Sequence, residues 1–261
     1  MSRINFNKVI CEIKGKTVDR PNLADLGTLS GHAAGEPFEK RVLAILREKY
    51  PKKIFKQYEF LNDLFLKHPK HITVQDKYAL IESPTAQFLL SRGDSATSKW
   101  MPDNLFDERQ SETADILYYE KGFYNIIDVK TRNLGKQAQS PNIISSYKVA
   151  QMCAYMIENQ EYDSIGIDYI GVDWHEDKAH GKLVCDDAQH VDLFRTTPSE
   201  LYINWGAGLQ IQFHPDRVGQ EWSGDIEQWA RTYLRHFVDS AQRRCDTMRA
   251  KFVEPFLKYL D

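Results

Sequence analysis

The sequence predicts an α/β protein in which a mixed central β-sheet is flanked by helices. Three observations lead to this prediction: helical periodicity in the N-terminal third, strand-like segments between residues 113 and 214, and a strongly helical pattern over residues 225–260. Hydrophobic residues make up 42% of the 261 residues, which is enough to bury a substantial core. We therefore expect one domain over residues 1–261, with helical elements at both ends.

The N-terminal third is predicted to be helical after an opening loop. Residues 15–35 are rich in Gly, Pro, Thr and Ser, which is typical of a loop. Residues 35–50 predict a helix, because Pro37 suits its first turn and apolar residues recur on one stripe. Residues 57–92 predict further helical segments. The stripe of the first helix consists of Phe38, Val42, Ile45 and Leu46.

One of the later helical segments has clear boundary signals. Ser83 suits the N-cap and Pro84 the first helical position. Gly93 is placed to end this helix.

The centre of the chain predicts strands and one helix. Residues 113–132 predict two strands joined by a turn at Glu120–Gly122. Residues 142–160 predict a helix, whereas the Gly and Asp content of residues 173–190 suits an exposed turn. Further strands are expected at residues 164–174, 199–205 and 209–214.

Composition narrows the class of protein. The formal net charge is −3, which argues against a protein that merely coats nucleic acid, although a local basic face would still allow DNA binding. The sequence has no apolar run of the roughly 18 residues needed to span a bilayer and no secretory h-region. Four scattered cysteines without a CxxC pair argue against a zinc ribbon and fit a reducing cytoplasm. We expect a cytoplasmic protein without a membrane partner.

Asp115, Asp128 and Lys130 carry the clearest chemical signal. Asp128 and Lys130 flank Val129 in a strand-like run, so both polar groups share one face of the strand. A charged pair in such an apolar strand is costly unless something pairs with it. Asp115 lies 13 residues before Asp128, and a hairpin-like return can place the two carboxylates opposite each other.

Two carboxylates and a lysine suit metal-dependent hydrolysis of a phosphodiester. The carboxylates of Asp115 and Asp128 can hold Mg2+, which lowers the pKa of bound water and stabilises negative charge on the phosphate. Lys130 can position or deprotonate the attacking water, and a lysine acting as a base needs a depressed pKa. The spacing alone also fits a surface salt bridge between Asp128 and Lys130, so both interpretations stay open at this point.

Longer phrases resemble a known family. They are GTLSGHAAGEPFEK (27–40), FLLSRG (88–93), TADIL (113–117), DVKTRN (128–133), PNIIS (141–145), SELYINW (199–205) and KFVEPF (251–256). Together they resemble the HincII-type branch of the type II restriction endonucleases, within the PD-(D/E)xK nuclease superfamily, over nearly the whole chain. The resemblance implies a restriction-endonuclease-like fold and a homodimer that cuts double-stranded DNA at GTPyPuAC with a blunt central cut. It also implies a cognate DNA methyltransferase in the same cell.

The resemblance assigns roles by position. It implies that Asp115 and Asp128 bind the metal and that Lys130 is the catalytic lysine; Ala114 stands where the superfamily motif has a proline. The residues it places at the bases are Gln139, as a minor-groove wedge, with Ser140, Asn142, Tyr202 and Asn204.

Some of these positions have alternative interpretations. By residue type alone, Asn142 after Pro141 suits a turn or cap, Asn204 a buried amide and Gln139 a solvated loop. Ser140 stands where the family is expected to have alanine, and Asp94 where it is expected to have lysine, so the recognition details there are open.

Candidate phosphate contacts come from basic residues near these motifs. They are Arg92, Arg132 and Lys136, with the basic stretch 243–251 as a further candidate that also fits a solvated helix face. The competing functions are a repair or junction-resolving nuclease, a DNA-binding protein without cleavage, and an unrelated small-molecule metalloenzyme.

Overall fold

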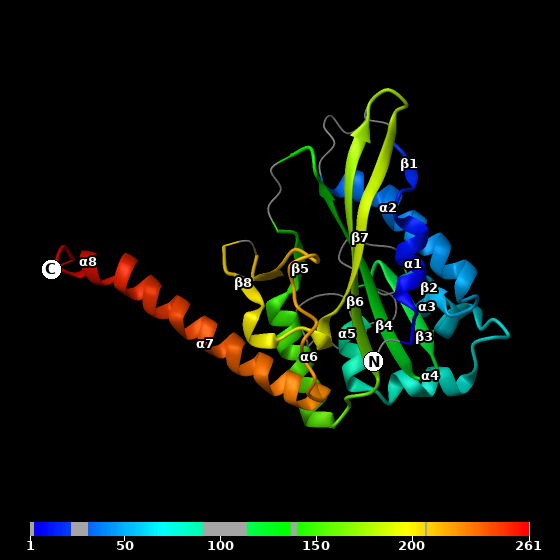
Figure 1. The fold of residues 1–261 in the computed structure, drawn as a ribbon. Helices are drawn as coiled ribbons and strands as arrows, with labels where there is room; N and C mark the ends of the chain where they lie inside the picture. The colour runs from blue at the N-terminus through cyan, green and yellow to red at the C-terminus, as the bar shows by residue number, and fades with distance from the viewer. Residues whose placement is uncertain (1–2, 22–30, 91–113, 137–139, 207, 261) are drawn as a thin grey trace.

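The computed structural model describes residues 3–21, 31–90, 114–136, 140–206 and 208–260, with the backbone alone for 31–34. Figure 1 shows a long, twisted sheet with helices on both sides and one helix that projects from the body. The predicted class, a mixed central sheet flanked by helices, is confirmed.

The described elements follow the order helices, strands, helices. The helices are α1 (Phe6–Ile13), α2 (Gly31–Lys49), α3 (Gln57–Asn62), α4 (Val74–Ile81), α5 (Pro84–Leu90), α6 (Ser146–Asn159), α7 (Ile226–Phe252) and α8 (Glu254–Leu257). The strands are β1 (Thr17–Asp19), β2 (Ile54–Phe55), β3 (Ile116–Glu120), β4 (Phe123–Asn133), β5 (Asn142–Ser145), β6 (Ile165–Asp177), β7 (Lys182–Asp192), β8 (Tyr202–Asn204) and β9 (Gln210–Gln212). Short helical turns cover Asp63–Lys67, Leu193–Arg195 and Pro198–Glu200.

These strands form two sheets. The larger sheet has the order β1-β7-β6-β4-β3-β2, in which β4 and β6 run parallel and the other neighbours run antiparallel. The smaller sheet has the order β5-β9-β8 and is antiparallel. The larger sheet carries the carboxylates, and the smaller one carries three of the residues expected at the bases.

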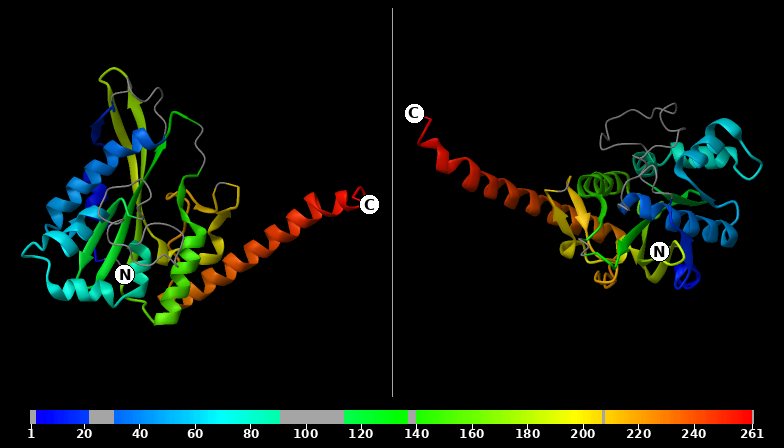
Figure 2. Two further views of the ribbon diagram at one scale, coloured as in Figure 1. Left: turned by 180° about the vertical axis from the view of Figure 1, so that it is seen from behind. Right: turned by 90° about the horizontal axis from the view of Figure 1, so that it is seen from above.

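Side-chain alternation divides the core into two layers. On β4, Ile127 and Val129 pack with α1 and α2, whereas Ile126 packs into the layer that contains α5, α6 and the start of α7. The views in Figure 2 show these helices on opposite faces of the sheet. Because both faces are covered, β4 is buried from Phe123 to Val129, and the charged Asp128 stands out within this stretch.

Several predicted boundaries are confirmed. The strand pair turns at Glu120–Gly122 as expected, since β3 ends at Glu120 and β4 begins at Phe123. Ser83 caps α5, because its hydroxyl accepts a hydrogen bond from the Ala86 amide at 3.1 Å. Gly93 lies outside the described residues.

Other expectations were wrong. Residues 173–190, expected as an exposed turn, instead form the end of β6 and most of β7, joined by a short turn. Residues 142–145 form β5 rather than the start of a helix, because the Ser145 side chain caps α6 by accepting from the Lys148 amide. In the expected loop 15–35, β1 pairs with β7 and α2 begins at Gly31.

The start of α7 is anchored and its remainder projects away. Trp229 and Tyr233 are buried and stacked, and the Trp229 indole donates to the Thr196 carbonyl at 2.9 Å. From Gln242 to Leu260 every side chain is exposed, and Figures 1 and 2 show this part extending beyond the body. None of the described helices is long and apolar enough to cross a membrane.

Candidate active site and DNA-reading face

A tight hairpin places the two predicted metal ligands opposite each other. Lys121 and Gly122 form the turn between β3 and β4, and both have positive φ angles (48° and 75°), which suits a two-residue hairpin. The turn fixes the register, in which Ile116 pairs with Ile127. The next position along places Asp115 across from Asp128.

The hydrogen bonds agree with this register. The Asp115 carboxylate accepts from the backbone amide of Val129 at 3.3 Å, and Asp128 pairs with the Lys130 ammonium at 2.6 Å. The side chains of Asp128 and Lys130 are 10% and 26% exposed. An ion pair this buried, with a second acid beside it, differs from the exposed salt bridge that the spacing alone allowed.

Burial and mutual repulsion perturb the charges of this cluster. Burial, and then the negative charge of Asp128, raise the pKa of Asp115 to about 9. Burial acts to lower the pKa of Lys130, but the charges of Asp128 and Asp115 outweigh it and raise that pKa above its usual value. Two adjacent carboxylates that resist joint ionisation are an arrangement that a divalent cation relieves.

Sequence reasoning missed a third acid near this cluster. Glu39 lies on α2, which packs against β4, and pairs with Lys56 at 3.7 Å. Burial, partly offset by Lys56, raises the pKa of Glu39, and the charge of Asp128 adds to the shift. The signal available in the sequence was the position of Glu39 directly beside Phe38, on the apolar stripe of the predicted helix.

The cluster of Asp115, Asp128 and Lys130 suits a hard cation that takes only a few of its ligands from the protein. Among the residues that the structure describes, no group of three or more His, Cys, Asp or Glu side chains could hold a metal ion. Asp115 and Asp128 would therefore contribute two carboxylates, leaving other positions to water and phosphate oxygens. This ligand set is typical of Mg²⁺, which commonly keeps several waters and binds substrate phosphate.

The smaller sheet gathers several residues expected at the bases. In the segments of β5, β9 and β8, the buried residues Ile143, Ile211 and Ile203 point to the core. The alternate positions form the opposite, polar face of this sheet, which we call the amide face. It consists of Asn142, Gln210, Gln212, Tyr202 and Asn204.

A chain of hydrogen bonds crosses the amide face. Gln212 donates through Nε2 to Asn142 Oδ1 at 2.6 Å, and its Oε1 accepts from Asn204 Nδ2 at 2.8 Å. Asn204 Oδ1 in turn accepts from the Gly206 amide at 2.9 Å. Asn204 is therefore not a fully buried amide but a partly exposed one, and Tyr202 beside it is largely exposed.

The remaining predicted DNA contacts lie in different places. Ser140 precedes β5 and is half-buried, and Lys136 ends the segment after β4. Arg92 and Gln139 lie outside the described residues, as does Asp94.

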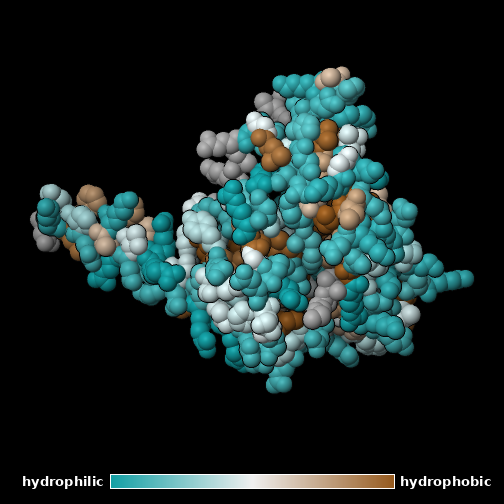
Figure 3. All heavy atoms as spheres, viewed as in Figure 1, coloured by the Kyte–Doolittle hydropathy of each residue, from teal (hydrophilic) through white to brown (hydrophobic). Residues whose placement is uncertain are grey.

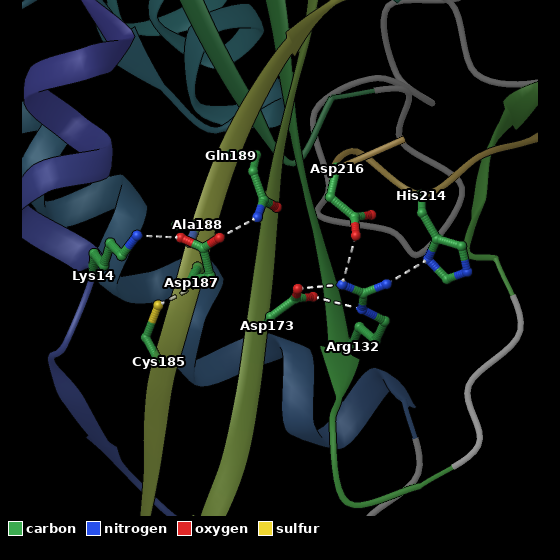
Figure 4. A network of polar contacts seen from close by, with 9 residues as sticks. All are labelled: Lys14, Arg132, Asp173, Cys185, Asp187, Ala188, Gln189, His214 and Asp216. Carbon is green, nitrogen blue, oxygen red and sulfur yellow. Dashed lines mark hydrogen bonds and ion pairs between the residues drawn. The ribbon is translucent and has the colours of Figure 1, made fainter. Parts of the chain in front are cut away.

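Arg132 is held by protein groups. Its guanidinium donates to both carboxylate oxygens of Asp173, with Nε to Oδ1 at 2.7 Å, and to Asp216 at 3.2 Å. Figure 4 shows these contacts together with His214, whose Nδ1 lies 3.2 Å from Arg132. Burial and then the positive charge of Arg132 lower the pKa of His214. Any phosphate contact by Arg132 would have to compete with these carboxylates.

The comparisons with known proteins agree with this geometry. The model of the restriction endonuclease HincII family matches residues 9–260. The chain belongs to the HincII restriction endonuclease family.

Two relatives of this family are similar over almost their full lengths. The type II restriction enzyme HindII of Haemophilus influenzae (strain ATCC 51907 / DSM 11121 / KW20 / Rd) is 53% identical over 247 residues, covering 94% of this chain and 93% of the relative. The type II restriction enzyme HincII of Haemophilus influenzae is 52% identical over the same shares. The family resemblance drawn from the sequence is thereby confirmed.

Proposed function

We propose that this HincII family member is a type II restriction endonuclease that hydrolyses phosphodiester bonds of double-stranded DNA in a reaction dependent on Mg²⁺. The observation that carries the proposal is the convergence of Asp115, Asp128 and Lys130 at one end of the β3–β4 hairpin. Family membership and the restriction enzymes among its relatives support it.

The chain's own residues divide the chemistry between them. Asp115 and Asp128 would hold the cation, which supplies positive charge beside the scissile phosphate and acidifies water. Lys130, held by Asp128, keeps its proton and its charge in the site as described, so it is suited to orient the attacking water and stabilise the phosphate. A role as the base would require the opposite direction of pKa shift.

The proposed target is a short, near-palindromic site, GTPyPuAC, cut bluntly at its centre. Asparagine side chains can make paired contacts with adenine, so the exposed Asn142 and the partly exposed Asn204 are suited to read base edges. Tyr202 and Ser140 would contact nearby base atoms. Gln139 would act as a wedge at the central pyrimidine–purine step, which unstacks easily. Arg92 and Arg132 are proposed phosphate contacts.

A two-fold site calls for two active sites, and we propose a homodimer. The projecting part of α7 with α8 supports this. Its exposed residues Cys245, Met248 and Phe252 continue a series that starts with the exposed Val238 and the half-buried Ala241. The series has alternating spacings of three and four, the pattern of a packed helical seam. Figure 3 shows apolar side chains on the projecting end.

Charge also favours a second copy as the partner of the projecting residues 242–260, which we call the arm. The arm holds five Lys and Arg against two Asp and Glu, whereas the chain as a whole has a net charge of −3. The arm is therefore positive and the rest of the molecule negative, so the arm of one copy complements the body of another.

One digestion experiment tests the proposed function. A sequenced plasmid is incubated with the purified protein in Mg²⁺, in Ca²⁺ and without metal, and the fragment ends are sequenced. We expect discrete fragments with blunt ends inside GTPyPuAC, in Mg²⁺ alone. Structure-dependent cutting at junctions would indicate a repair nuclease instead, and binding without cutting would indicate a non-cleaving protein.

The proposal includes a cellular setting. A restriction endonuclease that reaches the host DNA in the cytoplasm requires a cognate methyltransferase that protects the same sites. Expression without that methyltransferase is expected to be toxic, whereas expression of the Lys130→Ala variant is not.

A further inference from the structure

Gln212 occupies the centre of the amide face, between the two asparagines expected to read bases. In the strand register it is paired with Asn142 of β5 on one side and with Tyr202 of β8 on the other. It contacts both asparagines, at 2.6 Å and 2.8 Å, through opposite ends of its amide.

We propose that Gln212 is a positioning residue for sequence recognition, which fixes the amide orientations of Asn142 and Asn204 and couples them. The proposal rests on the proposed function, in which these two asparagines read bases. Gln212 acts through them and need not touch DNA.

Gln212 links Asn142 to Asn204 by two hydrogen bonds, and we call this link the bridge. The number of hydrogen bonds that an amide can make explains why the bridge matters. An amide oxygen accepts two hydrogen bonds and an amide nitrogen donates two. The bridge uses one acceptor of Asn142 and one donor of Asn204, so Asn142 keeps the capacity for further donor and acceptor contacts. One donor and one acceptor are what a paired contact with an adenine edge requires.

The bridge also removes an ambiguity. A free asparagine can rotate its amide by half a turn, which exchanges donor and acceptor and reverses the pattern offered to a base. The Gly206 amide donates to Asn204 Oδ1, so Asn204 turns its nitrogen toward Gln212. Gln212 in turn directs its own nitrogen to the oxygen of Asn142. The donor and acceptor pattern is therefore set before DNA arrives, which lowers the entropic cost of binding.

Buried isoleucines hold the bridge in place. Ile211 precedes Gln212 and is fully buried, and Ile143 and Ile203 lie on the same inner layer. Replacement of Gln212 therefore leaves the packing that forms the smaller sheet untouched.

The test compares two glutamines of the same strand. Gln212→Leu keeps most of the volume and removes both hydrogen bonds, whereas Gln212→Glu removes the donor to Asn142 and keeps the acceptor for Asn204. Gln210→Leu is the matched control, because Gln210 lies on the same face, as the strand partner of Asn204, but donates to the Gly208 carbonyl at 3.3 Å, so it tests whether loss of any amide beside Asn204 has the same effect. Each variant is assayed for cleavage rates on the cognate site and on sites with one changed base pair.

We expect Gln212→Leu to lower the ratio of cognate to altered-site kcat/KM by about tenfold, within the range of one paired base contact. Gln212→Glu is expected to lie between wild type and Gln212→Leu, and Gln210→Leu to leave the ratio unchanged. Thermal unfolding is measured on the same samples, since a purely structural role would shift Tm without changing the ratio.

Two results would overturn the inference. One is a Gln212→Leu ratio equal to that of Gln210→Leu, and the other is a specificity ratio unchanged by Asn142→Ala and Asn204→Ala. Either can occur while the wild type still cuts DNA, in which case the nuclease assignment stands. A wild type that does not cut DNA in Mg²⁺ would instead reject the proposed function.

Discussion

Asp115 and Asp128 form a buried pair of acidic groups that costs folding free energy. Their carboxyl groups face each other in a buried position, where burial and then the charge of Asp128 oppose ionisation of Asp115 and raise its pKa. Lys130 offsets part of this repulsion through its 2.6 Å contact with Asp128. This cost in stability is consistent with the chemical role proposed for the two residues.

Removing the lysine tests its proposed role in the reaction. Lys130→Ala is expected to lower the DNA cleavage rate at least about 100-fold, the scale seen when one group that stabilises developing charge is removed. Specific DNA binding in Ca²⁺, measured by gel shift, is expected to remain. Lys121→Ala, on the turn of the same hairpin, serves as the control and should cut normally. Wild-type cleavage by Lys130→Ala would contradict the assignment.

Replacing one carboxylate should separate activity from stability. Asp115→Asn is expected to abolish cleavage and yet to stabilise the metal-free protein by about 1–3 kcal/mol at neutral pH, because the buried carboxyl of Asp115 must take up a proton on folding whereas asparagine is already neutral. Cleavage assays and chemical denaturation in EDTA measure the two effects. A destabilised variant would contradict the raised pKa of Asp115.

Asp192 offers a test of electrostatics away from the proposed active site. Burial, and then the charge of Asp168, raise the pKa of Asp192 to about 6. An unfolded aspartate loses its proton near pH 4, so between about pH 4 and pH 6 the folded chain binds a proton that the unfolded chain has lost. The contribution of Asp192 to stability therefore falls as pH rises through this window.

The Asp192→Asn variant should remove this pH dependence. Asparagine can still accept the hydrogen bond from the Phe194 amide, which is 3.0 Å long in the wild type. We expect the variant to gain about 1–3 kcal/mol over the wild type at pH 8 and almost nothing at pH 4. Urea unfolding at both pH values measures the difference, with Asp246→Asn on the exposed arm as the control. Equal gains at both pH values would refute the argument.

At the scale of elements, the β3–β4 hairpin could be predicted and several neighbours could not. Its strands are bounded by a Gly-containing turn, and period-two alternation places Asp128 and Lys130 together. Strand β7 was missed because its exposed positions carry charged and polar residues typical of loops. Strand β5 was missed because its apolar residues continue into the pattern of α6, from which the Ser145 cap separates it.

The candidate site was predictable to the extent that it depends on local spacing. Asp115 could be paired with Asp128 because both lie on one hairpin. Glu39 and Gln212 could not be found in this way, since their importance depends on packing between segments far apart in the chain. The position of Gln212 between Ile211 and Phe213 gives no indication of the two asparagines that it contacts in the fold.

The turn of this hairpin gives a prediction at the same scale. Insertion of one residue between Lys121 and Gly122 would shift the pairing of β3 with β4 by one position or create a bulge. We expect cleavage to be lost although the turn lies at the other end of the hairpin from Asp115 and Asp128. A Lys121→Asn variant, which keeps the length and suits a positive φ, should remain active. Cleavage and circular dichroism of both variants provide the comparison.

At the scale of the whole molecule, the projecting arm calls for a partner. From Gln242 onward α7 and α8 expose large apolar groups such as Phe252 and Phe256, and isolated helices of this length are marginal in water. The double variant Phe252→Asp, Phe256→Asp is expected to convert a dimer of about twice 30.3 kDa into a monomer of 30.3 kDa in light scattering. Arg231→Ala, at the anchored start of α7, is the control.

A chemical cross-link can identify the surface that the arm contacts. Cys245 lies on the seam and is exposed, as is Cys11, whereas Cys153 and Cys185 are buried. In a Cys11→Ser background, a photoreactive label on Cys245 should attach to the body of a second, isotopically distinct copy. A dimer that persists in the double phenylalanine variant, with weaker DNA binding, would show that the arm contacts DNA instead.

In the proposed homodimer, an arm that must find another molecule would make double-strand scission depend on the amount of enzyme present. A solitary chain would have one set of the proposed catalytic groups and would break one strand, and a ligase reseals such a nick readily. Only when synthesis had raised the copy number would paired chains sever both strands. The extended C-terminus would thus give a newly infected or newly transformed cell time to methylate its chromosome first.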